Sequence, residues 1–372
     1  MRYKILVTGG AGFIGSFLVD KLIENGNDVT IFDNLEEQVH QGRIPEYINK
    51  SANFIKGDMR DYNALEKIVK EHEIIFHQAS MVGVGQSQYQ IKRYVDANIS
   101  GTGNLLDILV NSEHDVKKLI VASSMSIYGE GSYECEDCGK VLASLRSEEQ
   151  MRRKDWEIHC PNCGRVLEPI PTPEDKKPQS NSIYAITKKT QEEMCLNIGK
   201  TYGIPTVSLR YFNVYGPRQS LSNPYTGVCA IFISRIKNDN PPLIFEDGKQ
   251  SRDFISVHDI VEANILAMKS KNANYEIFNV GTGKQTTILE IANILIDLYN
   301  KNIKPKIVGK FRKGDIRHCF ADISKIRRKL GFKPKVSFED GIRELVEWSE
   351  REEARDKVDK ATQELKEKGL LR

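Results

Sequence analysis

Long apolar runs are missing from this chain of 372 residues. No stretch approaches the roughly 20 apolar residues that a membrane-spanning helix needs, so we expect no membrane partner. The opening segment Met1–Gly9 reaches glycine after three apolar residues, which is too few for the core of a secretory signal. We therefore expect a cytoplasmic location.

Charge of one sign is also lacking, because the net charge is only +3 although 28% of the residues are charged. So small a net charge does not favour nucleic acid as the main partner, and it is compatible with a phosphorylated ligand. No segment repeats at a fixed period, which argues against a solenoid or a propeller. The composition, 40% hydrophobic, is that of an ordinary globular protein, and the length suits two domains.

The first half of the chain alternates short apolar strands with amphipathic helices. Such alternation implies parallel pairing with helices on both faces of the sheet, as in a doubly wound α/β Rossmann fold. Beyond Asn213 the alternation lapses and Pro, Asn and Gly become more frequent, which indicates a second, smaller domain. We expect strands at residues 4–8, 29–33, 54–56, 74–77, 119–122 and 206–210, and helices at 17–25, 62–71, 98–110 and 188–202.

A glycine-rich loop, TGGAGFIG at Thr8–Gly15, follows the first strand and precedes the first helix. Gly9 suits a tight turn, Gly12 lets backbone N–H groups approach a pyrophosphate, and Gly15 lets the helix pack closely. The second strand ends at Asp33, where a carboxylate would bind a ribose 2′-hydroxyl and repel a 2′-phosphate. The loop therefore predicts a dinucleotide site that prefers NAD to NADP. Asp58 and Met59, after the third strand, would lie near the adenine.

Tyr184 and Lys188 are four positions apart, so on a helix they share one face. A free tyrosine, with a pKa of about 10, is a poor base at neutral pH. A neighbouring ammonium and a positive nicotinamide would stabilise the phenolate, which could then take a proton from a substrate hydroxyl. Ser124, at the end of a predicted strand, could bind the reacting oxygen.

Between Ser124 and Tyr184 lie two Cys-x-x-Cys pairs separated by 22 positions. Four thiolates at this spacing suit tetrahedral Zn²⁺ in a closed structural site, and a catalytic zinc would usually have histidine or carboxylate ligands. A redox disulfide pair and a site that has lost its metal stay open as alternatives. The intervening segment Arg146–Lys154 carries mixed charge, which is typical of a solvated helix rather than a nucleic-acid-binding ribbon. The predicted ligands are Cys135, Cys138, Cys160 and Cys163, whereas Cys195, Cys229 and Cys319 are expected to be buried thiols.

Taken together, these motifs resemble the extended short-chain dehydrogenases/reductases of the nucleotide-sugar epimerase and dehydratase group. The resemblance runs from Thr8 to about Trp348. It rests on TGGAGFIG (Thr8–Gly15), SSMSIYG (Ser123–Gly129), YAITK (Tyr184–Lys188), RYFNVYGPRQ (Arg210–Gln219), RDFISVHDI (Arg252–Ile260) and GDIRH (Gly314–His318).

The resemblance implies roles for single residues. Ser124, Tyr184 and Lys188 match the catalytic trio of the group. Asn213 and Arg252 match residues that contact the phosphates of the sugar nucleotide. By the same match, Asp315 and Arg317 would lie near the nucleotide.

The type of reaction is indicated by the two residues after Ser124. Related dehydratases carry an Asp-Glu pair there, which supplies the extra acid and base for elimination, whereas this chain has Met125 and Ser126. Net reduction would more often use NADPH, which Asp33 opposes. What remains is epimerisation through a 4-keto intermediate, with Tyr184 acting first as base and then as acid.

The length of the cysteine-bearing insert narrows the substrate further. An insert at this place resembles the subgroup that includes dTDP-L-rhamnose 4-epimerases, which form the 6-deoxy-L-talose sugar. It would emerge at the carboxyl edge of the sheet, and we hypothesise that it lines or covers the sugar pocket. Epimerisation of UDP-glucose, UDP-N-acetylglucosamine or UDP-glucuronate, a nucleotide-sugar dehydratase, and a catalytically silent NAD-binding sensor or scaffold are the alternatives. Relatives commonly dimerise through two helices, here about 98–110 and 184–199, so a homodimer is expected.

The sequence thus predicts an NAD-binding Rossmann domain at residues 1–212, interrupted by a zinc-ribbon-like insertion at about 130–170. A smaller nucleotide-sugar-binding domain follows at 213–350, from which some segments return to the first domain. Residues 351–372 are expected to form a charged, solvated helical tail. The predicted cofactor-binding residues are Gly9, Gly12, Phe13, Ile14, Gly15, Asp33, Asp58, Met59, Tyr184 and Lys188.

Overall fold

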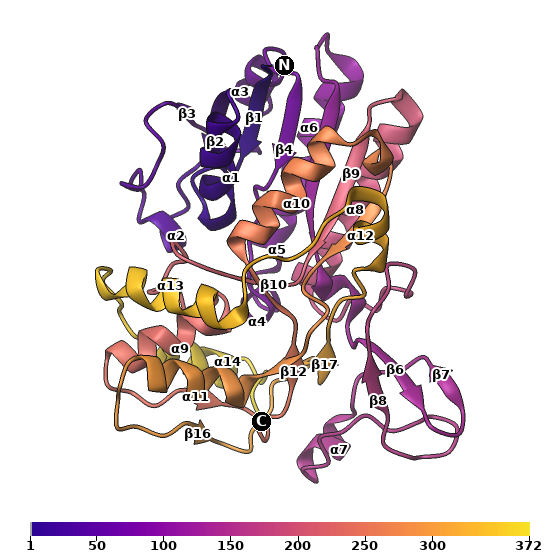
Figure 1. Ribbon diagram of the computed structural model, residues 1–372, viewed down its shortest axis with the longest axis vertical. Helices are drawn as coiled ribbons and strands as arrows, with labels where there is room; N and C mark the ends of the chain where they lie inside the picture. Colours follow the sequence, from indigo (N-terminus) through magenta and orange to yellow (C-terminus); the bar gives the residue numbers. More distant parts are fainter. Residues whose placement is uncertain (1) are drawn as a thin grey trace.

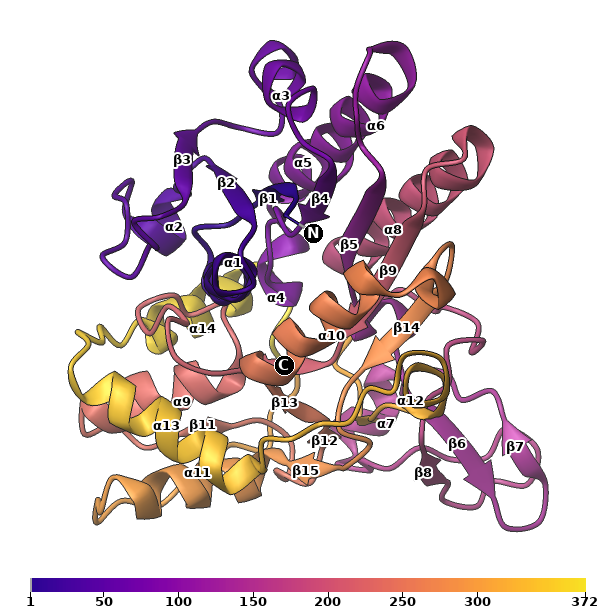
Figure 2. The ribbon, with the colours of Figure 1, turned by 45° about the horizontal axis from the view of Figure 1, so that its top comes forward.

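The computed structural model describes residues 2–372, and its centre is a seven-stranded parallel sheet (Figures 1 and 2). The strand order is β14-β9-β5-β4-β1-β2-β3, so the chain winds outward in both directions from β1 and β4. This is the doubly wound arrangement that the alternating sequence predicts, and it is confirmed. The strands are β1 (Lys4–Thr8), β2 (Asp28–Asp33), β3 (Asn53–Lys56), β4 (Ile74–His77), β5 (Lys118–Ser124), β9 (Thr206–Tyr211) and β14 (Ile277–Val280).

Side chains along each strand alternate between two separate hydrophobic cores, one on each face of the sheet. On β1, Ile5 and Val7 belong to the core beneath α1 and α10, whereas Leu6 belongs to the core beneath α3, α6 and α8. Because a strand directs successive side chains to opposite faces, a continuous apolar run is buried on both sides. The covering helices are α1 (Phe13–Glu24) and α10 (Val257–Lys269) on one face, and α3 (Tyr62–Val69), α6 (Gly101–Asn111) and α8 (Ile183–Tyr202) on the other.

The second domain is smaller and packs around its own core. Its helices surround a cluster that includes Ile233, Leu295 and Leu345. Strand β14 and helix α10 come from this half of the chain but complete the first domain, so the two domains are interleaved rather than consecutive. Its elements are α9 (Val228–Lys237), α11 (Ile288–Leu298), α13 (Phe338–Glu350), β10 (Asn213–Tyr215), β11 (Leu243–Ile244), β12 (Ser251–Arg252), β13 (Phe254–Ser256), β15 (Thr286–Thr287), β16 (Lys306–Ile307) and β17 (His318–Cys319).

The insertion forms a three-stranded antiparallel sheet with a small core that contains Tyr133, Ile158 and Leu167. It projects beside β12 and β17 at the lower right of Figure 1. The elements of the insertion are β6 (Ser132–Cys135), β7 (Gly139–Val141), α7 (Glu148–Arg152) and β8 (Glu168–Ile170).

The C-terminal tail differs from the solvated helix that its charge suggests. Helix α14 (Val358–Glu367) buries Ala361 and Leu365, which are four residues apart and share one helix face. Leu371 is buried as well. Two apolar side chains among many charges were enough to fix this face against the protein.

Short helices complete the chain, and none of the helices within residues 2–372 is long and apolar enough to cross a bilayer. The short helices are α2 (Glu37–His40), α4 (Val84–Ser87), α5 (Ile91–Tyr94), η1 (Val95–Ser100), η2 (Met125–Tyr128), η3 (Lys271–Ala273) and α12 (Ser324–Leu330).

Candidate active site

A cavity of about 500 Å³ opens at the carboxyl ends of the central strands. It extends from the loop after β1 to the loop after β9, across the point where the strand order reverses. Ligands of doubly wound α/β proteins bind at this switch point. Residues from the second domain, including Tyr225 and Gly227, line its other side.

The glycine-rich loop forms the floor of this cavity. Gly9 has a φ of +70°, and a Cβ there would lie 2.7 Å from the backbone N of Ala79. A Cβ on Gly15 would lie 2.2 Å from the carbonyl oxygen of Gly9, so only glycine lets α1 pack this closely. No side chain caps α1 at Gly12, and its first N–H groups border the cavity. Free donors at a helix N-terminus suit a pyrophosphate.

Asp33 lines the same cavity at the end of β2. Its Oδ2 accepts from the N–H of Ala11 (3.0 Å) and its Oδ1 from the N–H of Leu35 (2.8 Å). Burial raises the pKa of this carboxyl, and the two backbone N–H groups oppose that rise. Each oxygen keeps a lone pair for a ribose hydroxyl, so Asp33 both fixes the loop and fits the predicted cofactor role.

Asp58 and Met59 also border the cavity, as the sequence predicts for residues near the adenine. The guanidinium of Arg60 donates to Asp58 at 2.8 Å and holds the pKa of that carboxyl well below its usual range. Asn34 donates to the other oxygen of Asp58 at 2.9 Å.

Ser124, Tyr184 and Lys188 all line the cavity, although 60 positions separate the serine from the tyrosine. Ser124 ends β5, and the other two lie in the first turns of α8. The Oγ of Ser182 caps this helix by accepting from the N–H of Ala185 at 3.1 Å. The cap fixes the start of α8 and therefore the height at which the phenol and the ammonium enter the cavity.

Burial has the largest effect on the pKa values of Tyr184 and Lys188. It raises the pKa of Tyr184, and a hydrogen bond with Ser124 partly opposes the rise. It also lowers the pKa of Lys188, which is 3% exposed, to about 8. Since burial alone holds the phenol in its neutral form, a base role for Tyr184 needs positive charge beside the ring.

Four buried polar atoms on the cavity wall have no hydrogen-bond partner within residues 2–372. Unpaired buried polar groups cost free energy, and at a cavity wall they indicate where a ligand binds. Asn213 was predicted from its motif. Ser123, Ser126 and Gln219 were not predicted, although they lie within the motifs SSMSIYG and RYFNVYGPRQ. The atoms are the Oγ of Ser123, the Oγ of Ser126, the Oδ1 of Asn213 and the Oε1 of Gln219.

Three predicted substrate residues are not part of the cavity wall. Arg252 donates to the carbonyl oxygens of Ile316 (2.7 Å) and Arg317 (2.9 Å). Asp315 accepts from Arg312 at 2.8 Å. The cavity wall therefore includes Asn213 but none of these three residues. The phosphate contact of Arg252 and the place of Asp315 near the nucleotide stay predictions.

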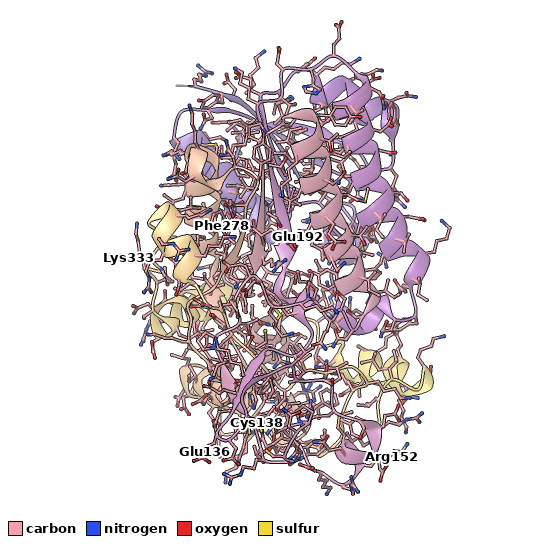
Figure 3. The ribbon with its side chains drawn as sticks, turned by 90° about the vertical axis from the view of Figure 1, so that its right-hand side faces the viewer. Glu136, Cys138, Arg152, Glu192, Phe278 and Lys333 are labelled. Carbon is pink, nitrogen blue, oxygen red and sulfur yellow. The ribbon has the colours of Figure 1, made fainter. Side chains whose placement is uncertain are left out.

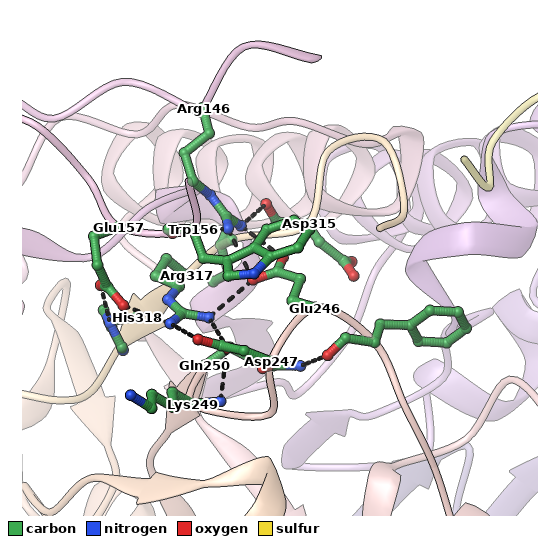
Figure 4. A network of polar contacts seen from close by, with 12 residues as sticks. Arg146, Trp156, Glu157, Glu246, Asp247, Lys249, Gln250, Asp315, Arg317 and His318 are labelled. Atoms are coloured by element: carbon green, nitrogen blue, oxygen red, sulfur yellow. Dashed lines mark hydrogen bonds and ion pairs between the residues drawn. The ribbon is translucent and has the colours of Figure 1, made fainter. Parts of the chain in front are cut away.

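Arg317 lies differently from its expected place near the nucleotide. It is 0% exposed, and its Nη atoms donate to Glu157 (2.5 Å), Glu246 (3.0 Å) and Asp247 (2.7 Å) (Figure 4). Three carboxylates compete for one guanidinium, so its donors are directed into the protein rather than towards a ligand.

The solvated helix expected over residues 146–154 is only partly present. Helix α7 begins only at Glu148, and Arg146 before it is buried. Its guanidinium binds both carboxylate oxygens of Glu246, at 2.8 and 2.9 Å (Figure 4). The insertion is therefore seated on the second domain by buried ion pairs, and no residue between 130 and 170 lines the cavity.

The four predicted metal ligands converge in the insertion, where their sulfur atoms all lie within 4.8 Å of one another. Two thiolates on a tetrahedral Zn²⁺ with bonds of about 2.3 Å would be about 3.8 Å apart, and the Sγ atoms of Cys135 and Cys163 are 3.5 Å apart. Hydrogen bonding with Cys163 is the main cause that raises the pKa of the Cys138 thiol to about 12. Four adjacent thiolates repel one another unless a cation lies between them, so the set fits zinc. The cluster lies at the lower end of the molecule in Figure 3, where Cys138 is labelled.

Zinc removal gives a local prediction. Replacing Cys160 with serine should abolish stoichiometric zinc, measured by atomic emission, and make the insertion sensitive to protease while the central sheet stays folded. The matched control is Cys229→Ser, because Cys229 is a buried thiol whose pKa burial raises to about 12 and which has no metal-ligand partners. Unchanged zinc content in Cys160→Ser would contradict the assignment.

Comparison with known proteins places the chain among enzymes. A family model described as "NAD dependent epimerase/dehydratase family" matches residues 5–144, and one described as "GDP-mannose 4,6 dehydratase" matches residues 164–345. A dTDP-L-rhamnose 4-epimerase of Burkholderia thailandensis is 34% identical over 94% of this chain and 95% of its own length. The chain belongs to the NAD-dependent epimerase/dehydratase family. A putative UDP-glucose 4-epimerase of Methanocaldococcus jannaschii is 36% identical over 92% of this chain and 97% of its own.

Solved structures of this family share the fold. A Thermotoga maritima UDP-glucose 4-epimerase with UDP-glucose aligns with a TM-score of 0.76 and 35% identity, covering 94% of this chain and 99% of its own. A Methanobrevibacter ruminantium UDP-N-acetylglucosamine 4-epimerase aligns with a TM-score of 0.75 and 36% identity, covering 93% and 98%. The predicted extended short-chain dehydrogenase/reductase family is therefore confirmed.

Proposed function

We propose that this protein catalyses NAD-dependent 4-epimerisation of a nucleotide-diphosphate sugar through a 4-keto intermediate. The observation that carries the proposal is one cavity that holds the glycine loop, Asp33, Ser124, Tyr184 and Lys188 together. Bound NAD would lie on the glycine loop and Asp33, and it would supply the hydride acceptor. Because the hydride returns to the sugar, the cofactor is not consumed.

The protein's residues then handle the proton. Tyr184, beside the cation of Lys188, takes the proton of the C4 hydroxyl as the C4 hydride leaves, and returns a proton to the oxygen after the keto sugar has turned over. Ser124 hydrogen-bonds the same oxygen and keeps it within reach of the phenol. Asn213 and Gln219 have unpaired oxygen atoms that can accept from the ligand.

Elimination of water is disfavoured by the same site. Met125 and Ser126 lie at the cavity wall directly after Ser124, and neither supplies a carboxyl. Ser126 can donate a hydrogen bond but is no acid at neutral pH. The dehydratase alternative therefore lacks its second acid–base pair.

Apolar side chains in the cavity wall suit a 6-deoxy sugar. Met81, Val82 and Met125 provide apolar surface for a C6 methyl group. Besides Lys188, Arg218 is the cationic side chain of the described wall, because burial lowers the pKa of the neighbouring His40 and favours its neutral form. Arg218 pairs with Asp20 at 2.7 Å, so its charge is already partly balanced and attracts a uronate carboxylate less strongly. A dTDP-6-deoxy-L-sugar such as dTDP-L-rhamnose is our preferred substrate, with UDP-glucose as the rival because of the 36% identical relative.

A substrate panel distinguishes the two. We expect NMR of the protein incubated with dTDP-L-rhamnose to show a new anomeric signal of the C4 epimer, with at least tenfold slower conversion of UDP-glucose and UDP-glucuronate. A hydrophobic pocket gains about 1–3 kcal/mol from a matching methyl group, which corresponds to this ratio. Faster conversion of UDP-glucose would reassign the substrate, and no conversion of any sugar would refute the epimerase.

We also propose a homodimer through α6 and α8. Ile186 and Tyr202 on α8 are 46% and 53% exposed, and a hollow lined by Leu106, Val110 and Met194 runs between the two helices. Size-exclusion chromatography with light scattering tests the assembly, and a monomer at all concentrations would contradict it.

A further inference from the structure

The C-terminal strap, residues 351–372, begins and ends on the second domain and reaches the first domain through its middle. At its start Asp356 pairs with Arg235 at 3.4 Å, both side chains being buried, and accepts from Asn240 at 2.7 Å. At its end Arg372 exchanges two backbone hydrogen bonds with Phe311, at 3.0 and 3.1 Å. Both ends of the strap are therefore fixed to the second domain.

The middle of the strap, helix α14, contacts the first domain. A Cβ on Gly85 would lie only 3.3 Å from Leu365, so α4 and α14 pack directly against each other. Glu364 accepts a hydrogen bond from Tyr89, which follows α4, at 3.1 Å and another from Tyr225 of the second domain at 2.5 Å. The two phenol oxygens are 2.7 Å apart. One carboxylate thus joins a residue of each domain.

These contacts continue into the cavity wall. Tyr225 lines the cavity, and its Cβ would be 3.3 Å from a Cβ on Gly83, another lining residue. Asn223 accepts from the N–H of Tyr225 (3.0 Å) and from Gln38 (3.0 Å), and both Asn223 and Gln38 line the cavity. Moving Tyr225 would therefore disturb both lips of the cavity.

The carboxylate of Glu364 is satisfied by neutral hydrogen-bond donors. A carboxylate taken from water needs donors, and the two phenols supply them. The pKa of Tyr225 and that of Tyr89 are both raised, chiefly by burial and additionally by their hydrogen bonds with Glu364. Both phenols therefore remain protonated donors at neutral pH.

We propose that the C-terminal strap closes the substrate end of the cavity and that Glu364 is the positioning residue that holds Tyr225 and Tyr89 in the closed arrangement. The inference rests on the proposed epimerisation, because a keto sugar that must turn over inside the cavity has to be retained there. If the keto sugar leaves early, the alcohol has been oxidised and the enzyme is left with reduced cofactor. The strap therefore retains the keto sugar in the cavity and takes no part in the chemical step.

Three variants test the positioning role. Glu364→Ala removes both hydrogen bonds, Glu364→Gln keeps one acceptor oxygen, and Glu367→Ala is the matched control because Glu367 is exposed on the same helix. We expect Glu364→Ala to raise KM on the order of tenfold and to accumulate bound NADH, seen by its absorbance, during turnover. Glu364→Gln should bring both the KM and the amount of bound NADH most of the way back to wild-type values. Glu367→Ala should match the wild type in both. Equal KM and equal NADH accumulation in Glu364→Ala and Glu367→Ala would overturn the proposal.

A second measurement is independent of the reaction. Trypsin cleaves after Lys366 and Lys368, which are exposed on the strap. We expect UDP or dTDP to slow this cleavage in the wild type at least threefold and to have no such effect in Glu364→Ala. If UDP and dTDP do not protect the wild type from trypsin, the closing role of the strap is refuted even if the protein epimerises a sugar. If the nucleotides protect a protein that converts no sugar of the panel, the closing role of the strap is supported and the proposed epimerisation is refuted. If Glu364→Ala does not fold, Tyr225→Phe, which removes one of the two donors, replaces it in both measurements.

Discussion

Tyr184→Phe should lower kcat by about two to four orders of magnitude, the range that positioned acid–base groups contribute. The substitution removes only the phenol oxygen, while the ring keeps its place on α8. The structure explains why no neighbour should replace it, because Lys188 is a buried cation and Ser124 has no acidity in this range. Turnover is measured by NMR with the preferred dTDP-sugar, and NAD affinity by calorimetry should change little.

The control for this variant is Tyr202→Phe, since Tyr202 lies on the same helix but is 53% exposed. It should retain wild-type kcat. A Tyr184→Phe protein with more than a tenth of wild-type kcat would mean that another group is the base. Lys188→Met removes the cation that lies four residues along the same helix face, which would leave the phenolate of Tyr184 less stabilised. We therefore expect the activity profile to shift to higher pH.

The sheet could be predicted closely from the sequence because its strands are short apolar runs bounded by turns. The bounds of β1 and β4, Lys4–Thr8 and Ile74–His77, coincide with the predicted ranges. The helix predicted at residues 98–110 instead consists of the π-helical turn η1, at Val95–Ser100, followed by α6. Apolar periodicity does not distinguish a wider turn from an α-helix, since both bury the same stripe.

The pairing of charges could not be predicted in the same way. Arg146 pairs with Glu246, 100 positions away, and Glu364 meets Tyr89 across 275 positions. Local composition gives both segments the appearance of solvated helix, because a charged residue looks the same in sequence whether water or a distant carboxylate satisfies it. Motifs located the reacting groups, whereas only the fold showed that Arg317 faces inward.

Arg317→Ala should lower the free energy of unfolding by about 3–5 kcal/mol, the cost typical of removing one partner from a buried ion pair. Glu246, which is 2% exposed, and its neighbour Asp247 would lose their shared cation. Arg146 remains bound to Glu246 and limits the loss to part of the cluster. Chemical denaturation measures the effect.

The exposed pair Arg153–Glu149, at 3.4 Å, provides the contrast. Arg153→Ala should change stability by no more than about 1 kcal/mol, because water screens such pairs. Equal effects of Arg153→Ala and Arg317→Ala would mean that the buried cluster does not hold the insertion on the second domain.

The same cluster predicts a dependence of stability on acid. Hydrogen bonding with His318, followed by that with Arg317, lowers the pKa of Glu157 to about 2. A carboxyl whose pKa is lowered in the folded protein stabilises the fold fully above its unfolded pKa of about 4.3, and this contribution is lost as the pH falls towards 2. Glu157→Gln should therefore flatten the loss of stability between about pH 4 and pH 2. Because Glu157 belongs to the insertion and His318 to the second domain, the flattening would show that acid weakens the protein at the seat of the zinc-binding insertion.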